Sequence, residues 1–169
     1  TLEKLGYKKE SKEHYQKALS MSKRLYNNND HPSIVNTLTN MGNVLQNLGD
    51  RDEAIDHYQK ALAMSKRLYN DNEHLNIAAS LNGLGTILPT KIAIQYAEQA
   101  YKMTERLVGK NHPNTVLYLI NYTRCFPLNL FMNNKAKKML IEFQESLYDN
   151  IKLYNQIEEE IKCREPKRG

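Results

Sequence analysis

Histidine is the residue type in this chain best suited to acid–base chemistry or metal binding at neutral pH, and its five copies fall into two repeating sets. His14 and His57 occupy equivalent places in a repeated segment, and His31, His74 and His112 occupy equivalent places in the loop that follows it. A catalytic or metal site needs different groups that converge on one point. Residues that recur once per repeat are instead spread along the molecule. We therefore expect structural roles for the histidines, with no bound metal and no other cofactor.

Other signatures of catalysis are also missing from the sequence. Cys125 and Cys163 lie far apart, without zinc-ligand spacing and too few for a disulfide framework, so free thiols in a reducing cytoplasm are expected. Export as an effector is the alternative location. Gly83-Leu84-Gly85 lacks the third glycine and the preceding strand of a phosphate-binding loop. The chain is therefore not predicted to be an enzyme.

The charge balance bears on the class of partner. The sequence has 24 Lys and Arg against 19 Asp and Glu, a formal charge of +5, which favours acidic partners. The pairs Lys23-Arg24 and Lys66-Arg67 lie near tyrosines, but Tyr58 and Tyr69 fall on or beside the apolar helix side, opposite the basic pairs. No apolar run reaches the ~18–20 residues of a membrane span. We therefore expect neither nucleic-acid binding nor membrane insertion.

The clearest pattern in the sequence is an internal repeat. Residues 14–29 recur as residues 57–72 with only two differences. In a weaker third copy, Ala93-Ile94 corresponds to Ala54-Ile55. The loop after each copy recurs as Asp30-His31-Pro32, Glu73-His74-Leu75 and Asn111-His112-Pro113. A period of this length indicates an array of repeated supersecondary units.

Each unit is predicted to contain two amphipathic helices. In the second unit they cover about residues 33–48 and 51–69, where apolar residues recur at steps of three and four. Gly49 is placed to end the first helix, and Pro32 suits its first turn. His31 or the aspartate before it is expected to cap that turn.

Two glycines stand inside predicted first helices of successive units, Gly42 and Gly85. A glycine in the middle of a helix costs about 1 kcal/mol relative to alanine. A recurring glycine at such a position usually marks the close approach of a neighbouring helix. We therefore expect both positions to lie against a packed neighbour.

These residues resemble the tetratricopeptide repeat (TPR), and the longer unit with its His-Pro loop resembles the kinesin-light-chain type of that family. The matching positions are Leu38, Met41-Gly42, Leu45, Ala54, Tyr58 and Ala61. The resemblance implies an all-α fold, a right-handed α-solenoid of helix-turn-helix repeats. It also implies a family that binds peptides or proteins in a concave groove and does not catalyse reactions.

Residues 1–126 are predicted to form the array, with a truncated first unit, a full second unit, a shortened third unit and the start of a fourth. The first unit is expected to begin inside its first helix, because Leu5-Gly6 corresponds to Leu48-Gly49. The third unit lacks about one helical turn before Pro89, and proline cannot continue a helix without breaking it. A tight turn is therefore expected at Pro89.

Residues 127–163 are predicted to form a divergent last unit with a long capping helix, and residues 164–169 a basic tail. The helix begins near Asn134, and Glu158-Glu159-Glu160 make its outer side polar, as a terminal repeat requires. A coiled-coil arm that pairs with another chain is the alternative. The apolar stripe is Ala136, Leu140, Phe143, Leu147, Ile151, Tyr154, Ile157 and Ile161.

The family resemblance places the binding groove on the first helix of each unit, beside its buried stripe. An amide side chain offers both a donor and an acceptor, so a row of Asn residues suits the backbone of an extended peptide. Arg124 could clamp a carboxylate with two hydrogen bonds. The alternative is that Asn is simply frequent in this chain. The predicted groove residues are Asn36, Thr39, Asn40, Asn43, Asn47, Asn82, Thr86, Asn121 and Arg124.

The sequence thus predicts a protein–protein interaction module, an adaptor or scaffold that binds an extended or acidic peptide. Two other functions remain open. The chain could be the sensory or regulatory arm of a larger enzyme or ATPase switch protein, or it could self-associate through the open ends of its repeat array.

Overall fold

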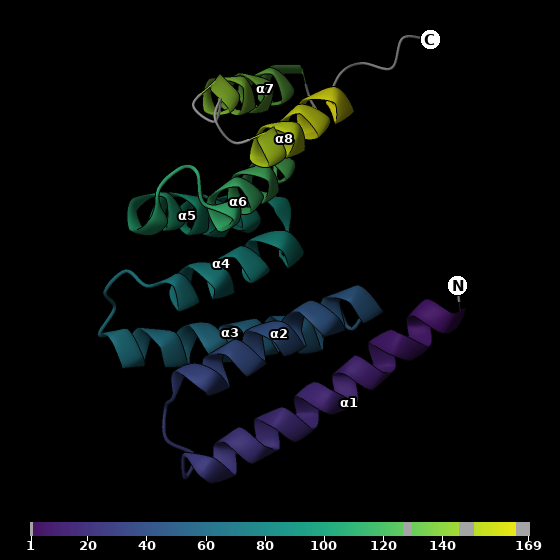
Figure 1. Cartoon of the computed structure of the whole chain (residues 1–169), viewed down its shortest axis with the longest axis vertical. Helices are drawn as coiled ribbons and strands as arrows, with labels where there is room; N and C mark the ends of the chain where they lie inside the picture. Colours follow the sequence, from purple (N-terminus) through teal and green to yellow (C-terminus); the bar gives the residue numbers. More distant parts are fainter. Residues whose placement is uncertain (1, 127–129, 146–150, 165–169) are drawn as a thin grey trace.

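The computed structural model describes residues 2–126, 130–145 and 151–164, and within these ranges the side chains of 2–9, 90, 130–133 and 151–154 are not described. All regular structure in the described residues is α-helical (Figure 1). The helices are α1 (Leu2–Leu25), α2 (Pro32–Leu48), α3 (Arg51–Tyr69), α4 (Leu75–Ile87), α5 (Thr90–Val108), α6 (Pro113–Arg124), α7 (Leu130–Glu145) and α8 (Ile151–Cys163).

The helices pack pairwise as helix-turn-helix units stacked in chain order. Each helix contacts the next one, and α2 also contacts α4, α4 contacts α6, and α6 contacts α8. The backbones of α1 and α3, and of α3 and α5, do not approach each other as closely in the described part of the chain, although Lys12 of α1 donates to Glu53 of α3 at 2.9 Å. We call α2, α4 and α6 the A helices and α1, α3 and α5 the B helices. Because the A helices approach one another more closely than the B helices do, the stack curves with the A helices on its inner side.

The second unit matches its prediction closely. His31 is the N-cap of α2, and Pro32 is its first residue. Gly49 ends α2 in the left-handed conformation, with φ at +93°. Asn70 ends α3 in the same conformation. Small left-handed turn residues therefore set the lengths of both helices.

The third unit is shortened as predicted. α4 has 13 residues whereas α2 has 17, a difference of about one turn. Leu88 and Pro89 alone separate α4 from α5, and the backbone carbonyl of Pro89 accepts from the N–H of Ala93 at 2.9 Å. The tight turn expected at Pro89 is present.

Two boundary predictions differ from the structure. α1 runs without a break through Leu5-Gly6, where a helix end was expected from the match to Leu48-Gly49. The residue after Gly6 is Tyr7, whereas Asp50, the N-cap of α3, follows Gly49. The first unit therefore contributes one long helix in place of a helix end and a turn.

The single long capping helix expected from Asn134 onward is also not observed. The segment forms α7 and the 13-residue α8, which pack against each other. Phe143 and Ile157 share one apolar cluster with residues of α6, although a straight helix would separate them by about 21 Å. Both side chains can therefore be buried against α6 only if the segment forms two helices. Leu147 lies outside the described residues, as do the side chains of Ile151 and Tyr154.

The core contains one aromatic ring enclosed by two glycines. Tyr58 of α3 is fully buried, and a Cβ atom added to Gly42 of α2 would lie 2.5 Å from its ring. A Cβ atom added to Gly83 of α4 would meet the same ring just as closely. Gly85 instead approaches the backbone of Ala97 on α5. The close approaches expected at Gly42 and Gly85 are confirmed, and Gly83 provides a third that the repeat pattern did not indicate.

The loop histidines act as N-caps. Nδ1 of His31, His74 and His112 accepts the backbone N–H of the residue two positions later, at 3.1 Å in each case. The ring of His31 stacks on Tyr26 at 3.4 Å between centroids, and that of His74 stacks on Tyr69 at 3.5 Å. An Nδ1 that accepts a hydrogen bond belongs to a neutral imidazole with its proton on Nε2.

The same loops carry ion pairs to the following B helix. Asp30 accepts from Arg67 Nε and Nη2 at 2.6 and 2.8 Å, and Glu73 accepts from Arg106 Nε at 3.0 and 3.1 Å. The hydrogen bonds from the guanidinium groups lower the pKa of Asp30 and of Glu73. Each pair joins the start of an A helix to the B helix of its own unit.

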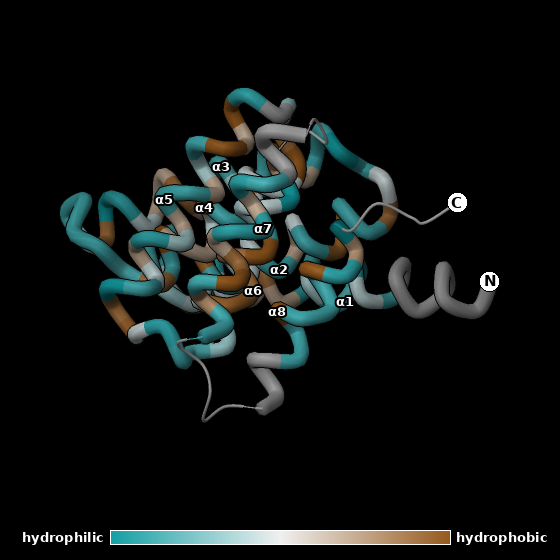
Figure 2. Tube along the Cα trace, turned by 90° about the horizontal axis from the view of Figure 1, so that it is seen from above, coloured by the Kyte–Doolittle hydropathy of each residue, from teal (hydrophilic) through white to brown (hydrophobic). Residues whose placement is uncertain are grey.

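The basic pairs of α1 and α3 are exposed, on the side predicted from the sequence. Lys23, Arg24, Lys66 and Arg67 are exposed, whereas Tyr58 is buried. In the view along the stack, hydrophobic residues recur along the inner helix turns while the peripheral loops are mostly hydrophilic (Figure 2). Among the described residues, no helix is long and apolar enough to cross a membrane, and no three His, Cys, Asp or Glu side chains group as metal ligands would.

We predict that Gly83→Ala destabilises the fold. The added methyl group would overlap the buried ring of Tyr58, so we expect a loss of about 1–3 kcal/mol in the free energy of unfolding, measured by urea denaturation. In a Tyr58→Leu background the penalty should shrink, because the ring is absent. A stabilisation like that of an ordinary helical Gly→Ala change, about 1 kcal/mol, would contradict this packing.

We also predict a pH-dependent contribution from His74. Burial lowers the pKa of His74 below its ordinary value of 6.5, so the folded state binds its proton less readily than the unfolded state. Stability from this group is complete above pH 6.5 and is lost as the pH falls below it. Asparagine caps helices without titrating. As the pH falls, the wild type should therefore lose more free energy of unfolding than His74→Asn does. A difference between the two proteins that stays constant with pH would contradict a lowered pKa of His74.

Candidate functional site

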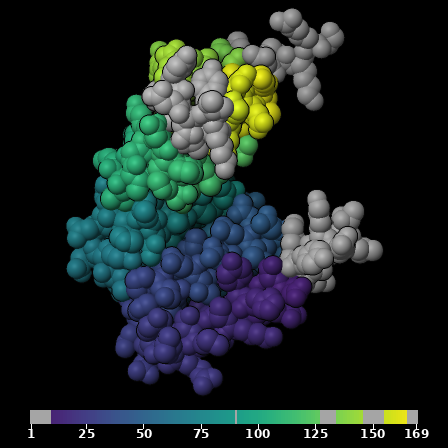
Figure 3. Space-filling model, in the orientation of Figure 1, coloured from purple at the N-terminus to yellow at the C-terminus, as the bar shows by residue number. Residues whose placement is uncertain are grey.

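One groove runs across the A helices and collects most of the predicted site residues. It has a volume of about 630 Å³, and the molecular surface is recessed on the side between α2 and α8 (Figure 3). Seven of the nine predicted residues line it: Thr39, Asn40, Asn43, Asn47, Asn82, Thr86 and Asn121. Three successive units therefore contribute to one continuous surface.

Hydrogen bonds tie the groove floor to the core. The phenol oxygen of Tyr58 lies 2.7 Å from Asn43 Oδ1 and 2.9 Å from Gln46 Oε1. The phenol carries one proton and therefore donates to one amide oxygen at a time. Burial raises the pKa of Tyr58, so the phenol keeps that proton at neutral pH. The enclosed ring thus holds two groove amides in place.

Contacts between neighbouring A helices extend this network. The side chains of Gln46 on α2 and Thr86 on α4 are 3.3 Å apart, and Asn121 Nδ2 on α6 donates to Asn82 Oδ1 on α4 at 3.0 Å. Asn40 is exposed on the groove side, and no described residue hydrogen-bonds to its side chain. The groove therefore combines oriented amides with at least one that faces solvent.

Two predicted residues lie outside the groove. Asn36 is exposed on α2, one turn before Asn40, and does not line it. Arg124 was predicted to bind a carboxylate in the groove, but its guanidinium binds Glu160 of α8 instead, with Oε2 at 3.0 Å from Nε and 2.9 Å from Nη2. The sequence analysis placed Glu160 on an outer surface, so it did not predict that Arg124 of α6 would face Glu160 of α8.

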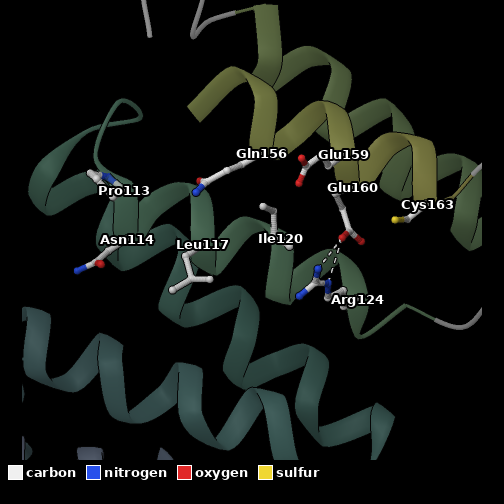
Figure 4. A pocket seen from close by; sticks show the side chains of 9 residues that line it. All are labelled: Pro113, Asn114, Leu117, Ile120, Arg124, Gln156, Glu159, Glu160 and Cys163. Atoms are coloured by element: carbon white, nitrogen blue, oxygen red, sulfur yellow. Dashed lines mark hydrogen bonds and ion pairs between the residues drawn. The ribbon is translucent and has the colours of Figure 1, made fainter. Parts of the chain in front are cut away.

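A second pocket of about 410 Å³ lies between α6 and α8, and Figure 4 shows Arg124 and Glu160 joined across it. The side chain of Glu160 is only 7% exposed and also accepts from Arg164 Nε at 3.2 Å. Arg164, expected in the basic tail, is itself buried. The prediction of an outward-facing Glu160 is therefore wrong, and Arg164, which directly follows the end of α8 at Cys163, packs beside it. Residues 165–169 lie outside the described residues.

Sequence reasoning missed four residues of the groove: Gln46, Ala79, Leu117 and Tyr118. Gln46 lies one turn after Asn43, so helical spacing could have found it. Leu117 lies one turn before Asn121 and is 47% exposed, which makes it an apolar contact at the groove wall. Leu117 lines the pocket between α6 and α8 as well, so the two cavities adjoin.

The groove offers recognition by hydrogen bonds and small apolar contacts, without charge. None of its lining residues is Asp, Glu, Lys, Arg or His. Amide side chains present donors and acceptors in pairs, as the peptide backbone does. The site is therefore equipped to hold a polar, uncharged chain segment.

Comparison with known families decides the class of this fold. A family model of the tetratricopeptide repeat matches residues 8–67 and 33–88, and a second model of the same repeat matches residues 90–114. These matches span more than half of the chain. The chain belongs to the tetratricopeptide repeat family. The TPR assignment makes it a protein-interaction module, a class of domain that is typically non-catalytic.

Solved structures give the same fold. A Podosopora anserina protein, described as a kinesin light chain with nearly identical TPR-like repeats, has a TM-score of 0.75 at 15% identity, covering 94% of this chain and 78% of that one. BtubC (BKLC) from P. vanneervenii has a TM-score of 0.65 at 15% identity, covering 99% of this chain and 80% of that one. No curated protein sequence matches. At such identity the likeness concerns the fold alone.

We predict that Glu160→Ala loosens α8 more than Arg124→Ala does. Glu160→Ala removes the carboxylate shared by two arginines, and loss of one partner of a buried pair costs about 3 kcal/mol. Arg124→Ala leaves Glu160 paired with Arg164 and removes a side chain that is 61% exposed. Hydrogen exchange should show faster exchange in α8 for the first variant only, and equal exchange in the two variants would contradict the arrangement.

Proposed function

We propose that this TPR domain is an adaptor that holds an extended peptide segment of a partner protein in the groove of α2, α4 and α6. The continuous groove across three units carries this proposal, because a single unit would offer too few contacts for a chain segment. The uncharged lining favours recognition of the peptide backbone over recognition of charged side chains.

Three structural features support an extended occupant. The groove amides come from three successive A helices, with four on α2, one on α4 and one on α6, so they are spread along the A layer and do not converge on a point. Asn43 and Gln46 are already oriented by Tyr58, which reduces the side-chain entropy lost on binding. Leu117 adds an apolar contact next to Asn121, which suits a small apolar side chain of the peptide.

The acidic partner considered from the net charge has less support at this groove. Arg124 already binds Glu160 and does not line the groove. The exposed basic residues Lys23, Arg24 and Lys66 lie on helices that do not line it. The proposed ligand is therefore an extended peptide that does not need to be negatively charged.

Asn40 and Asn36 provide a matched test. Both are exposed asparagines on α2, one turn apart, but only Asn40 lines the groove. Peptides selected from a library of short unstructured sequences should bind Asn40→Ala about three- to tenfold more weakly than wild type, the effect of one lost hydrogen bond. Asn36→Ala should bind as wild type does, measured by fluorescence anisotropy.

These variants are preferable to a substitution at Asn43, which also lines the groove. Asn43 is bonded to the buried phenol of Tyr58, so its removal would disturb the core as well as the groove. If peptide binding is equally sensitive to Asn36→Ala and Asn40→Ala, or to neither, the peptides bind elsewhere and the groove proposal fails.

A further inference from the structure

The repeat provides an internal comparison between α1 and α3. Residues 14–25 of α1 match residues 57–68 of α3 at every position but one, yet their surroundings differ. On α3, Ala61, Met64 and Leu68 pack against Ile34 and Val35 of α2, in the same apolar cluster. The A helix of the unit thus covers this side of its B helix.

On α1 the same side is uncovered. Met21 is 70% exposed and Leu25 is 68% exposed, whereas their counterparts on α3 are partly buried. Ala18 is exposed, although the equivalent Ala61 is fully buried. Because the residues are the same on both helices, their types cannot explain the difference in exposure. The difference is that no described helix occupies the place on α1 that α2 occupies on α3.

An electrostatic contact is missing at the same place. Arg67 of α3 binds Asp30, which immediately precedes the N-cap of α2, and Arg106 of α5 binds Glu73 before α4. Arg24 is the equivalent of Arg67. Among the described residues, it has no carboxylate partner, and it is exposed. The apolar side of α1 and Arg24 therefore lack the two kinds of contact that an A helix supplies elsewhere.

We propose that the side of α1 formed by Ala18, Met21, Arg24 and Leu25 is a docking surface for an amphipathic helix from outside these 169 residues. The helix carries the apolar spacing of α2, a pair of adjacent β-branched residues followed by leucine three residues later. It also carries an acidic residue directly before its N-cap, which pairs with Arg24. This surface is separate from the groove, and the proposal does not depend on the groove proposal.

A second copy of the chain fits this surface less well. At the other end of the array, the described exposed positions of α8 are Asn155, Gln156, Glu159, Lys162 and Cys163. A polar helix surface of this kind would bury polar groups against Met21 and Leu25, which is unfavourable without hydrogen-bond partners. An extended peptide is also disfavoured, because the surface is the side of one helix and the α2 contact on α3 is helix to helix.

A synthetic peptide with the sequence of residues 29–48 is the probe, since it carries Asp30 and the apolar residues of α2. We expect saturable binding to the wild-type protein by fluorescence anisotropy. The double variant Met21→Ser with Leu25→Ser, which changes only exposed side chains, should weaken binding at least about tenfold. Circular dichroism checks that the variant keeps its helicity.

Charge reversal tests the acidic requirement. Arg24→Glu should weaken binding of the peptide, and a peptide with Asp30→Arg should restore it. Lys23→Glu makes the same change of charge at the adjacent exposed residue, on another side of α1, and should have little effect. Equal losses for the two variants would show non-specific attraction and would overturn the assigned contact.

The oligomeric state distinguishes a helix from outside the chain from a second copy of the chain as the occupant of this surface. Sedimentation of the protein without peptide should show a monomer. A dimer that Met21→Ser with Leu25→Ser converts to a monomer would assign the surface to a second copy and overturn the proposal. Absence of saturable peptide binding, or binding unchanged in that double variant, would overturn it as well.

Discussion

The enclosure of one tyrosine ring by two glycines is the contact on which the rest of the molecule depends. Tyr58 projects from a B helix, and its ring fills the space that Gly42 and Gly83 leave open on two successive A helices. This single ring therefore sets the spacing of α2, α3 and α4 at once. Its hydroxyl group reaches the groove and holds Asn43 and Gln46. Packing density in the core and amide orientation in the groove have one common cause, so a change in one alters the other.

Periodicity predicted the elements that depend on neighbours in the sequence. Helical spacing located α2 and α3, and the His-Pro loop indicated the N-cap at His31. Gly42 could be recognised because a glycine recurs at Gly85, whereas Gly83 could not, since its equivalent in the preceding unit is Asn40. The close approach at Gly83 exists because Tyr58 lies in one unit and α4 in the next. Such a contact between units leaves no signature in the period of either helix.

The sequence predicted more of the groove than of the C-terminal end of the array. Its residues follow from the helix side that the buried stripe leaves free, and the same helical spacing places Gln46 one turn after Asn43. Arg124 was misplaced for a different reason. Its environment depends on how α8 returns to α6, and the stripe from Ala136 to Ile161 is equally compatible with one long helix or with two. Glu160 then becomes a buried partner of two arginines, which charge patterning alone places in solvent.

The near identity of α1 and α3 has a consequence for the evolution of such arrays. Because both helices offer the same residues to the A helix that follows them, a duplicate of residues 30–72 inserted after residue 72 would meet a surface already fitted to it. The number of units can thus increase or decrease by recombination between the matching gene segments, without a new packing solution at the junction. The length of the groove would change with each gain or loss of a unit. Copy number, independent of side-chain substitution, is a second variable by which this architecture can adapt.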